Sequence, residues 1–191
     1  MSTEPEEGVL NALPLEEAAD LVCSILEEGI VHEVAPGPFP ASRFLRSSQD
    51  FSLVYAVKRA GTTVIAVASV LRAGVAHDAT TQALLTGWGG QLPTRTFFVI
   101  PHADGADETL GVVVLQASFP FVLLADKPSA LTGGYGMELL RSTIYAPSEL
   151  AGGVQSESQT LDGLHVDINQ LGGRPAAVPD VVLAANVLIP A

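Results

Sequence analysis

The first clear pattern of hydrophobic and polar positions is helical and lies near the start of the chain. Between Leu15 and Leu26, apolar residues recur every three or four positions and acidic residues fill many of the positions between them. This spacing places the apolar side chains on one face of an amphipathic helix. Pro14 suits the first turn of such a helix and Gly29 suits its end. The sequence therefore predicts a helix over residues 15–28 that packs through Leu15, Ala18, Val22, Ile25 and Leu26.

Most of the later patterns are typical of β-strands. Apolar residues alternate from Phe51 to Val57, and a β-branched run follows over residues 62–71. Residues 59–61 supply a turn between them, so the two runs are expected to form an antiparallel hairpin. Similar apolar, β-branched runs predict further strands over residues 31–35, 94–100, 110–116, 119–125, 164–168 and 181–188.

Two more helices complete the predicted elements. Asp78 is a suitable N-cap for a helix that extends to about Trp88, and residues 137–145 form the third helix. The order of helix, strands, helix and strands predicts an α+β fold, with a mainly antiparallel sheet flanked by two or three helices on one side. Residues 1–12 are expected to be a flexible acidic tail, and residues 13–191 a single α+β domain.

The charge of the chain limits its partners. The net charge is −12, and residues 1–42 contain nine acidic side chains but no Lys or Arg. Such a chain is repelled by phosphate backbones and by anionic lipids, so we expect neither nucleic-acid nor membrane binding. The acidic start either attracts a basic protein partner or serves solubility alone. Candidate partner-binding residues are Glu16, Glu17 and Asp20 on the first helix, together with Trp88, for which burial in the core is the alternative.

Composition and the apolar runs add an expected assembly state and location. Hydrophobic residues make up 48% of the chain and charged residues 16%, against about 25% charged residues in an ordinary globular domain. Pairing of identical chains is the usual way to cover such an apolar excess, so we predict a homo-oligomer, most simply a dimer. The start lacks the positive charge of a secretory signal, and apolar runs such as residues 119–125 are far below the about 20 residues of a membrane span. A cytoplasmic protein is therefore expected.

The candidate chemistry is limited to pairs of histidine and aspartate. His102 and Asp104, like His165 and Asp167, are two positions apart, which on a strand places both side chains on one face. Imidazole and carboxylate groups bind divalent metals, although this spacing matches no metal-family pattern. The chain has no Gly-x-Ser-x-Gly elbow, and its cluster of glycines at residues 133–136 lacks the lysine of a phosphate loop. We therefore expect no catalytic residues, no metal and no cofactor, with the two pairs as the metal-enzyme alternative.

Part of the chain resembles a known family. Residues 15–29, followed by Ile30-Val31-His32-Glu33-Val34, look like the opening helix and strand of the YbjN-type proteins, which share the type III secretion-chaperone-like fold. Three later segments are similar to that family's second helix and following hairpin: residues 80–92, 95–100 and 111–115. The resemblance covers residues 15–125. It implies a dimeric α/β protein that binds polypeptide and has no catalytic residues.

Three functions follow as hypotheses. The leading one is a non-catalytic protein-binding protein, of the chaperone-like or assembly kind, that presents apolar surfaces to a protein partner. A structural subunit of a larger particle, such as a viral or shell assembly, is the alternative within the same class. The third hypothesis is a small metal-dependent enzyme that uses His102, Asp104, His165 and Asp167.

Overall fold

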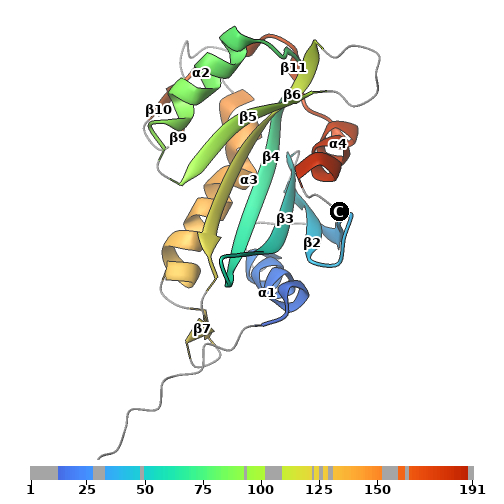
Figure 1. The fold of residues 1–191 in the computed structure, drawn as a ribbon, viewed down its shortest axis with the longest axis vertical. Coiled ribbons are helices and arrows are strands. Elements are labelled where there is room, and N and C mark those ends of the chain that lie inside the picture. Colours follow the sequence, from blue (N-terminus) through green and yellow to red (C-terminus); the bar gives the residue numbers. More distant parts are fainter. Residues whose placement is uncertain are drawn as a thin grey trace, which may run out of the picture.

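A large antiparallel sheet forms the centre of the molecule (Figure 1). The computed structural model describes residues 13–27, 33–47, 50–92, 94–101, 109–121, 123–124, 127–128, 131–151, 159–161 and 164–188. The sheet has seven strands in the order β1-β2-β3-β4-β6-β5, and β11 pairs with β4. The predicted α+β class with a mainly antiparallel sheet is confirmed. The strands are β1 (Glu33–Pro36), β2 (Ser42–Ser47), β3 (Asp50–Arg59), β4 (Thr62–Ala76), β5 (Arg95–Pro101), β6 (Leu110–Pro120) and β11 (Arg174–Pro175).

The predicted hairpin is the β3–β4 pair. Arg59 lies opposite Thr62, and the two residues between them, Ala60 and Gly61, have φ angles of 48° and 81°. Two consecutive positive φ angles are typical of the tight turn whose twist matches that of an antiparallel pair. Strand β4 then extends five residues beyond the predicted end, to Ala76, and also pairs with β6.

Three helices cover one face of this sheet. They are α1 (Leu15–Glu27), α2 (Ala79–Gly89) and α3 (Met137–Ala151). The helix predicted at the start of the chain is confirmed as α1, but its buried face is turned slightly from the expected one. Ala19 and Cys23 are buried together with Ala18, Val22 and Leu26, whereas Leu15 and Ile25 are half-buried. The apolar side of α1 packs on the sheet beside α3.

The start of α2 also follows the prediction. The carboxylate of Asp78 accepts the backbone N–H of Thr81 at 2.8 Å, which is the N-cap interaction expected from the sequence. This hydrogen bond lowers the pKa of the Asp78 carboxyl, because it stabilises the charged form. Helix α3 is longer than predicted: it continues through Pro147 to Ala151, and a π-helical turn, η1 (Leu131–Gly136), precedes it.

The fourth helix is the main correction to the prediction. Residues 181–188 were expected to form a strand, but they belong to helix α4 (Val178–Leu188), which packs on the opposite face of the sheet. Their β-branched residues favour strands, yet Val181, Ala184 and Ala185 are buried at helical spacing. The sheet is therefore flanked by four helices in the described part of the chain and on both faces, not by two or three on one.

Smaller differences concern short strands. Strand β2 was not predicted, and the strand expected over residues 119–125 is divided between the end of β6 and a separate hairpin of β7 (Leu123–Leu124) and β8 (Lys127–Pro128). The run at residues 164–168 divides into β10 (Leu164–Val166), paired with β9 (Gln159–Leu161), and the 3-10 helix η2 (Ile168–Leu171). The predicted tail at residues 1–12 lies outside the described residues. None of the helices in the described ranges is long and apolar enough to cross a membrane.

Candidate protein-binding surface

The two faces of the sheet differ in how they are covered. In β3, Val54 and Ala56 point to the side of α1 and α3, whereas Leu53 and Tyr55 point to the side of α4. We call this second side the open face, because α4 is the one helix that packs on it in the described part of the chain. The face is apolar, and it extends over residues of β3, β4, β5 and β6 that pack with Val181, Ala184 and Ala185 of α4.

A network of polar contacts attaches the start of α4 to the sheet. Arg174 donates two hydrogen bonds to the carboxylate of Asp180, at 2.7 and 2.9 Å, and the N–H of Ala177 donates a third at 2.7 Å. Asp180 is only 3% exposed, so its charge is matched where it is buried. Arg72 of β4 donates to the backbone oxygens of Gly172 and Gly173, at 2.9 and 3.2 Å, next to the short β11–β4 pairing. These contacts fix where α4 begins.

A groove of about 430 Å³ lies between α4 and the strands at the β1 end of the sheet. We call it the α4 groove. Phe44 and Phe51 come from the sheet side, and Val178 and Val182 come from α4, where they are 46% and 42% exposed. The remaining lining residues are Glu33, Ala35, Leu45, Arg46 and Val181. The volume lies in the range of protein ligand sites, about 300–1,000 Å³, and the lining is mainly apolar.

The charged lining residues of the groove form a pair. Arg46 of β2 lies 3.6 Å from the carboxylate of Glu33 of β1, and both side chains are more than half exposed. The guanidinium of Arg46 also lies over the ring of Phe51, 5.7 Å from its centroid. This arrangement leaves the groove with one cation and one anion and no net charge.

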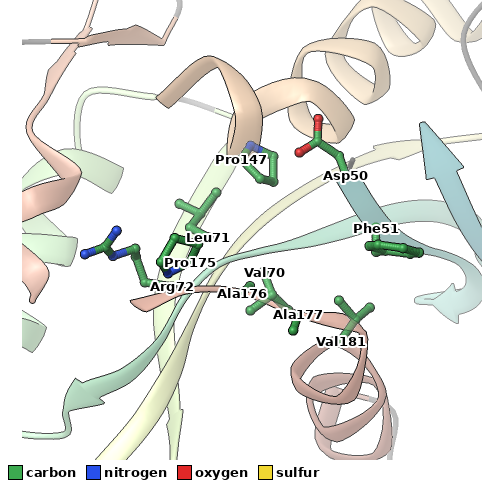
Figure 2. Close-up of a pocket in the computed structure, with 10 residues that line it drawn as sticks. All are labelled: Asp50, Phe51, Val70, Leu71, Arg72, Pro147, Pro175, Ala176, Ala177 and Val181. Carbon is green, nitrogen blue, oxygen red and sulfur yellow. The ribbon is translucent and has the colours of Figure 1, made fainter. Parts of the chain in front are cut away.

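A smaller cavity of about 160 Å³ shares the lining residues Phe51 and Val181 with the groove (Figure 2). Figure 2 shows Asp50 near Pro147 of α3, and Arg72 near Pro175 on the opposite side of the cavity. Arg72 is already engaged with the carbonyls of residues 172 and 173. The cavity is smaller than an ordinary ligand site. We therefore treat the cavity as part of the apolar surface beside α4 and not as a separate ligand site.

The acidic candidate residues on α1 lie close to an arginine just beyond the range of the charge count. Residues 1–42 contain no Lys or Arg, but the next residue, Arg43 of β2, lies 2.6 Å from Asp20 and 4.0 Å from Glu16. The structure thus brings Glu16 and Asp20 together around one guanidinium, and Glu17 is exposed on the same helix. Part of the negative charge of this surface is compensated within the chain.

Trp88 is a core residue in this structure and not a surface anchor. It is 7% exposed and packs edge-on against Phe97 of β5, with ring centroids 5.6 Å apart and an angle of 69° between the rings. The position of Trp88 on the inner side of α2 explains this burial, because α2 packs on β5. The structure therefore favours the core alternative for Trp88 over the partner-anchor interpretation.

The described residues do not form the metal site that the metal-enzyme hypothesis requires. His102 and Asp104 lie outside them, and His165 lies in β10 opposite Thr160. Asp167 caps η2: its carboxylate accepts the N–H of Asn169 at 3.1 Å and the side-chain amide of Gln170 at 3.3 Å. Across the described ranges, no group of three or more His, Cys, Asp and Glu side chains is placed to hold a metal ion.

The single cysteine has no nucleophilic character. Cys23 is buried in α1, and this burial raises the pKa of its thiol to about 12. Asp20 and Glu27 raise the pKa further, whereas Arg43 lowers it. The thiol therefore stays protonated at neutral pH and behaves as a small apolar core residue.

The groove residues are the part of the surface that the sequence did not reveal. Phe44 belongs to a strand that the sequence pattern does not predict. Val182 lies in the run 181–188, whose β-branched residues predict a strand, and Val178 precedes that run. One signal for them was present, since Val181, Ala184, Ala185 and Leu188 recur at helical spacing. Neither the protein-family models nor the characterised proteins with which the chain was compared include a match to it.

Proposed function

We propose that the chain is a non-catalytic protein-binding protein, of the chaperone-like or assembly kind, and that it meets protein through the α4 groove. The observation that carries this proposal is the exposed apolar surface of α4. Four large hydrophobic side chains are strongly exposed in the described residues, and two of them, Val178 and Val182, belong to α4 and line the groove. Single exposed apolar residues are ordinary, but a group beside an apolar groove is typical of protein contact sites.

The acidic surface of α1 adds a second, electrostatic element to the proposal. It lies on the other side of the sheet from the groove, because α1 and α4 pack on opposite faces. An acidic surface accelerates the approach of a basic protein, and this effect weakens as salt screens the charges. The ion pairs of Arg43 with Asp20 and Glu16 limit its strength. We assign this surface a steering role and assign the groove the contact itself.

The resemblance to YbjN-type proteins agrees with this proposal. This resemblance rests on residues 15–34, 80–92, 95–100 and 111–115, within the range 15–125. Polypeptide binding without catalysis is what that family likeness implies. Helix α4, with its half of the groove, lies beyond those residues and is argued from its own exposed valines.

The two other hypotheses remain as alternatives with separate consequences. A structural subunit of a larger particle would use the same apolar surface in a permanent assembly. A metal-dependent enzyme would instead need His102, Asp104, His165 and Asp167 to converge. The cap that Asp167 forms on η2 gives this carboxylate a structural role already. The protein-contact proposal requires no such convergence.

Replacement of single residues in cells that produce the protein tests the proposal. We expect the Val182→Asp variant to lose the ability to correct whatever defect deletion of the gene causes, because a charge is placed in an apolar contact. We expect His165→Ala and His102→Ala to correct that defect fully. Melting curves of the purified variants establish that each is folded. A folded His165→Ala or His102→Ala protein without activity, beside an active Val182→Asp protein, would replace the binding proposal with the enzyme.

A further inference from the structure

Helix α4 is apolar on the side that faces its own sheet and on the flank that lines the α4 groove. Val181, Ala184 and Ala185 are buried on the open face, while Val178 and Val182 on that flank are 46% and 42% exposed. The one charged residue of the helix, Asp180, is turned inward to Arg174. A helix with an apolar flank beside its buried face is suited to pack on a second element as well as on its own sheet. The described part of the chain itself supplies only the sheet.

The α4 groove has the position that a second helix would need. Its lining includes Ala35, Phe44 and Phe51 from three neighbouring strands, β1, β2 and β3, and α4 provides its side wall. A helix placed there would pack on the sheet through one face and on Val178 and Val182 through another. Helices packed side by side have axes about 8–10 Å apart, so such a helix would lie in one layer with α4.

We propose that the occupant of the groove is helix α4 of a second copy of this chain, in a two-fold symmetric dimer. This inference rests on the proposed function, which makes the groove a protein-contact surface. The exposed valines and the groove lie side by side on one surface. A two-fold axis between them therefore seats each helix in the groove of the other copy, as an isologous interface requires. The two α4 helices then form one layer between two sheets.

Charge favours a second copy over a basic partner at this surface. The chain carries a net charge of −12, so two copies associate only where their acidic surfaces stay apart. The acidic residues of α1 lie beyond the opposite face of the sheet, whereas the charged side chains around α4 are matched as Glu33 with Arg46 and Arg174 with Asp180. Glu33 and Arg46 pair with each other within the chain, so this surface has no net charge to repel the same surface of a second copy. A basic partner would instead be attracted to the acidic side chains of α1.

The experiment compares two aspartate variants of one helix by light scattering of the purified full chain. Val182 lines the groove, and Val187, which is similarly exposed, is not among the lining residues. We expect the native chain and Val187→Asp to have about twice the 19.8 kDa mass of one chain at micromolar concentration. We expect Val182→Asp to weaken association at least about 100-fold and to scatter as a single chain. Circular dichroism establishes that each variant keeps its fold.

A second variant, Val178→Asp, keeps the inference testable if Val182→Asp does not fold. Val178 also lines the groove but occupies the first position of α4, where a negative charge stabilises a helix. Val178→Asp should therefore dissociate the dimer without harming α4. A single-chain mass for the native protein overturns the inference, and so does a dimer that survives in both Val178→Asp and Val182→Asp. Either result is compatible with the proposed function if Val182→Asp still fails to correct the defect of the gene deletion in cells. A different protein would then occupy the groove.

Discussion

The Val22→Asp variant should lower the free energy of unfolding by about 3 kcal/mol or more. Val22 is fully buried in α1, within the apolar cluster that joins this helix to the sheet and to α3. A carboxylate there loses its hydration and finds apolar neighbours such as Leu26 and Ile144, which belong to the same cluster. The loss is measured by urea denaturation of the native and variant proteins.

Ser24→Asp is the matched control for this variant. It introduces the same side chain into the same helix, but Ser24 is exposed to solvent. The change should alter stability by no more than about 0.5 kcal/mol, as is usual for a surface substitution. Glu17→Ala, also exposed, should change stability equally little. Similar losses for Val22→Asp and Ser24→Asp would show that the buried face of α1 is assigned to the wrong side.

The Gly173→Ala variant should lose about 3 kcal/mol of stability and loosen the attachment of α4. Gly173 has a φ of 65°, and a Cβ there would lie 2.3 Å from the backbone oxygen of Ala73 and 3.0 Å from that of Gly74. Both neighbours are backbone atoms of β4, so the β11–β4 pairing has to move apart. Urea denaturation measures the loss, and hydrogen exchange should show faster exchange of the α4 amides.

Gly74→Ala separates the steric effect from the backbone effect. Gly74 has nearly the same φ, 67°, but a Cβ there has no neighbouring atom within 4 Å. We expect this variant to lose only about 1 kcal/mol, which is the cost of a left-handed conformation for alanine. Equal losses at the two glycines would mean that the close approach of residues 172–173 to β4 does not hold α4 in place.

The predictable parts of the fold are those fixed by local pattern. The 3–4 spacing from Leu15 to Leu26 identified α1, and Asp78 identified the start of α2, because each signal is contained within a few turns. The β3–β4 hairpin followed from the turn predicted at residues 59–61 between two apolar runs. Helix α4 was mistaken for a strand because its valines have high β propensity, while tertiary packing on the open face selects the helix.

The site depends on contacts that no local pattern contains. Phe44 and Phe51 are separated from Val178 and Val182 by more than one hundred positions, and the sheet register and the turn at Gly172 and Gly173 bring them together. The charge pairing between Arg43 and Asp20 likewise spans α1 and β2. The sequence left Trp88 as either a partner anchor or a core residue, and the structure places it between α2 and β5. The candidate site therefore depends on tertiary packing and not on any local sequence pattern.

The proposed function assigns different roles to the two surfaces. Helix α4 and the groove form an apolar surface without net charge on the open face, and α1 presents acidic side chains beyond the other face. The affinity of a contact through the groove should depend little on salt concentration, because the contact buries apolar area. The attraction of a basic protein to α1 should weaken as the salt concentration rises, because the Debye length shortens. A dimer through α4 would leave both acidic helices pointing outward and accessible.

Photo-crosslinking in living cells tests the central claim most directly, namely that the α4 groove contacts protein. A photoreactive amino acid is placed at position 182 in the groove or, as the control, at position 187 on the same helix. The account predicts light-dependent covalent adducts with protein from position 182 and few or none from position 187. Mass spectrometry then identifies the adduct as a second copy of this chain or as another protein. Absence of adducts from position 182 in a folded variant, or equal yields from both positions, would contradict the account.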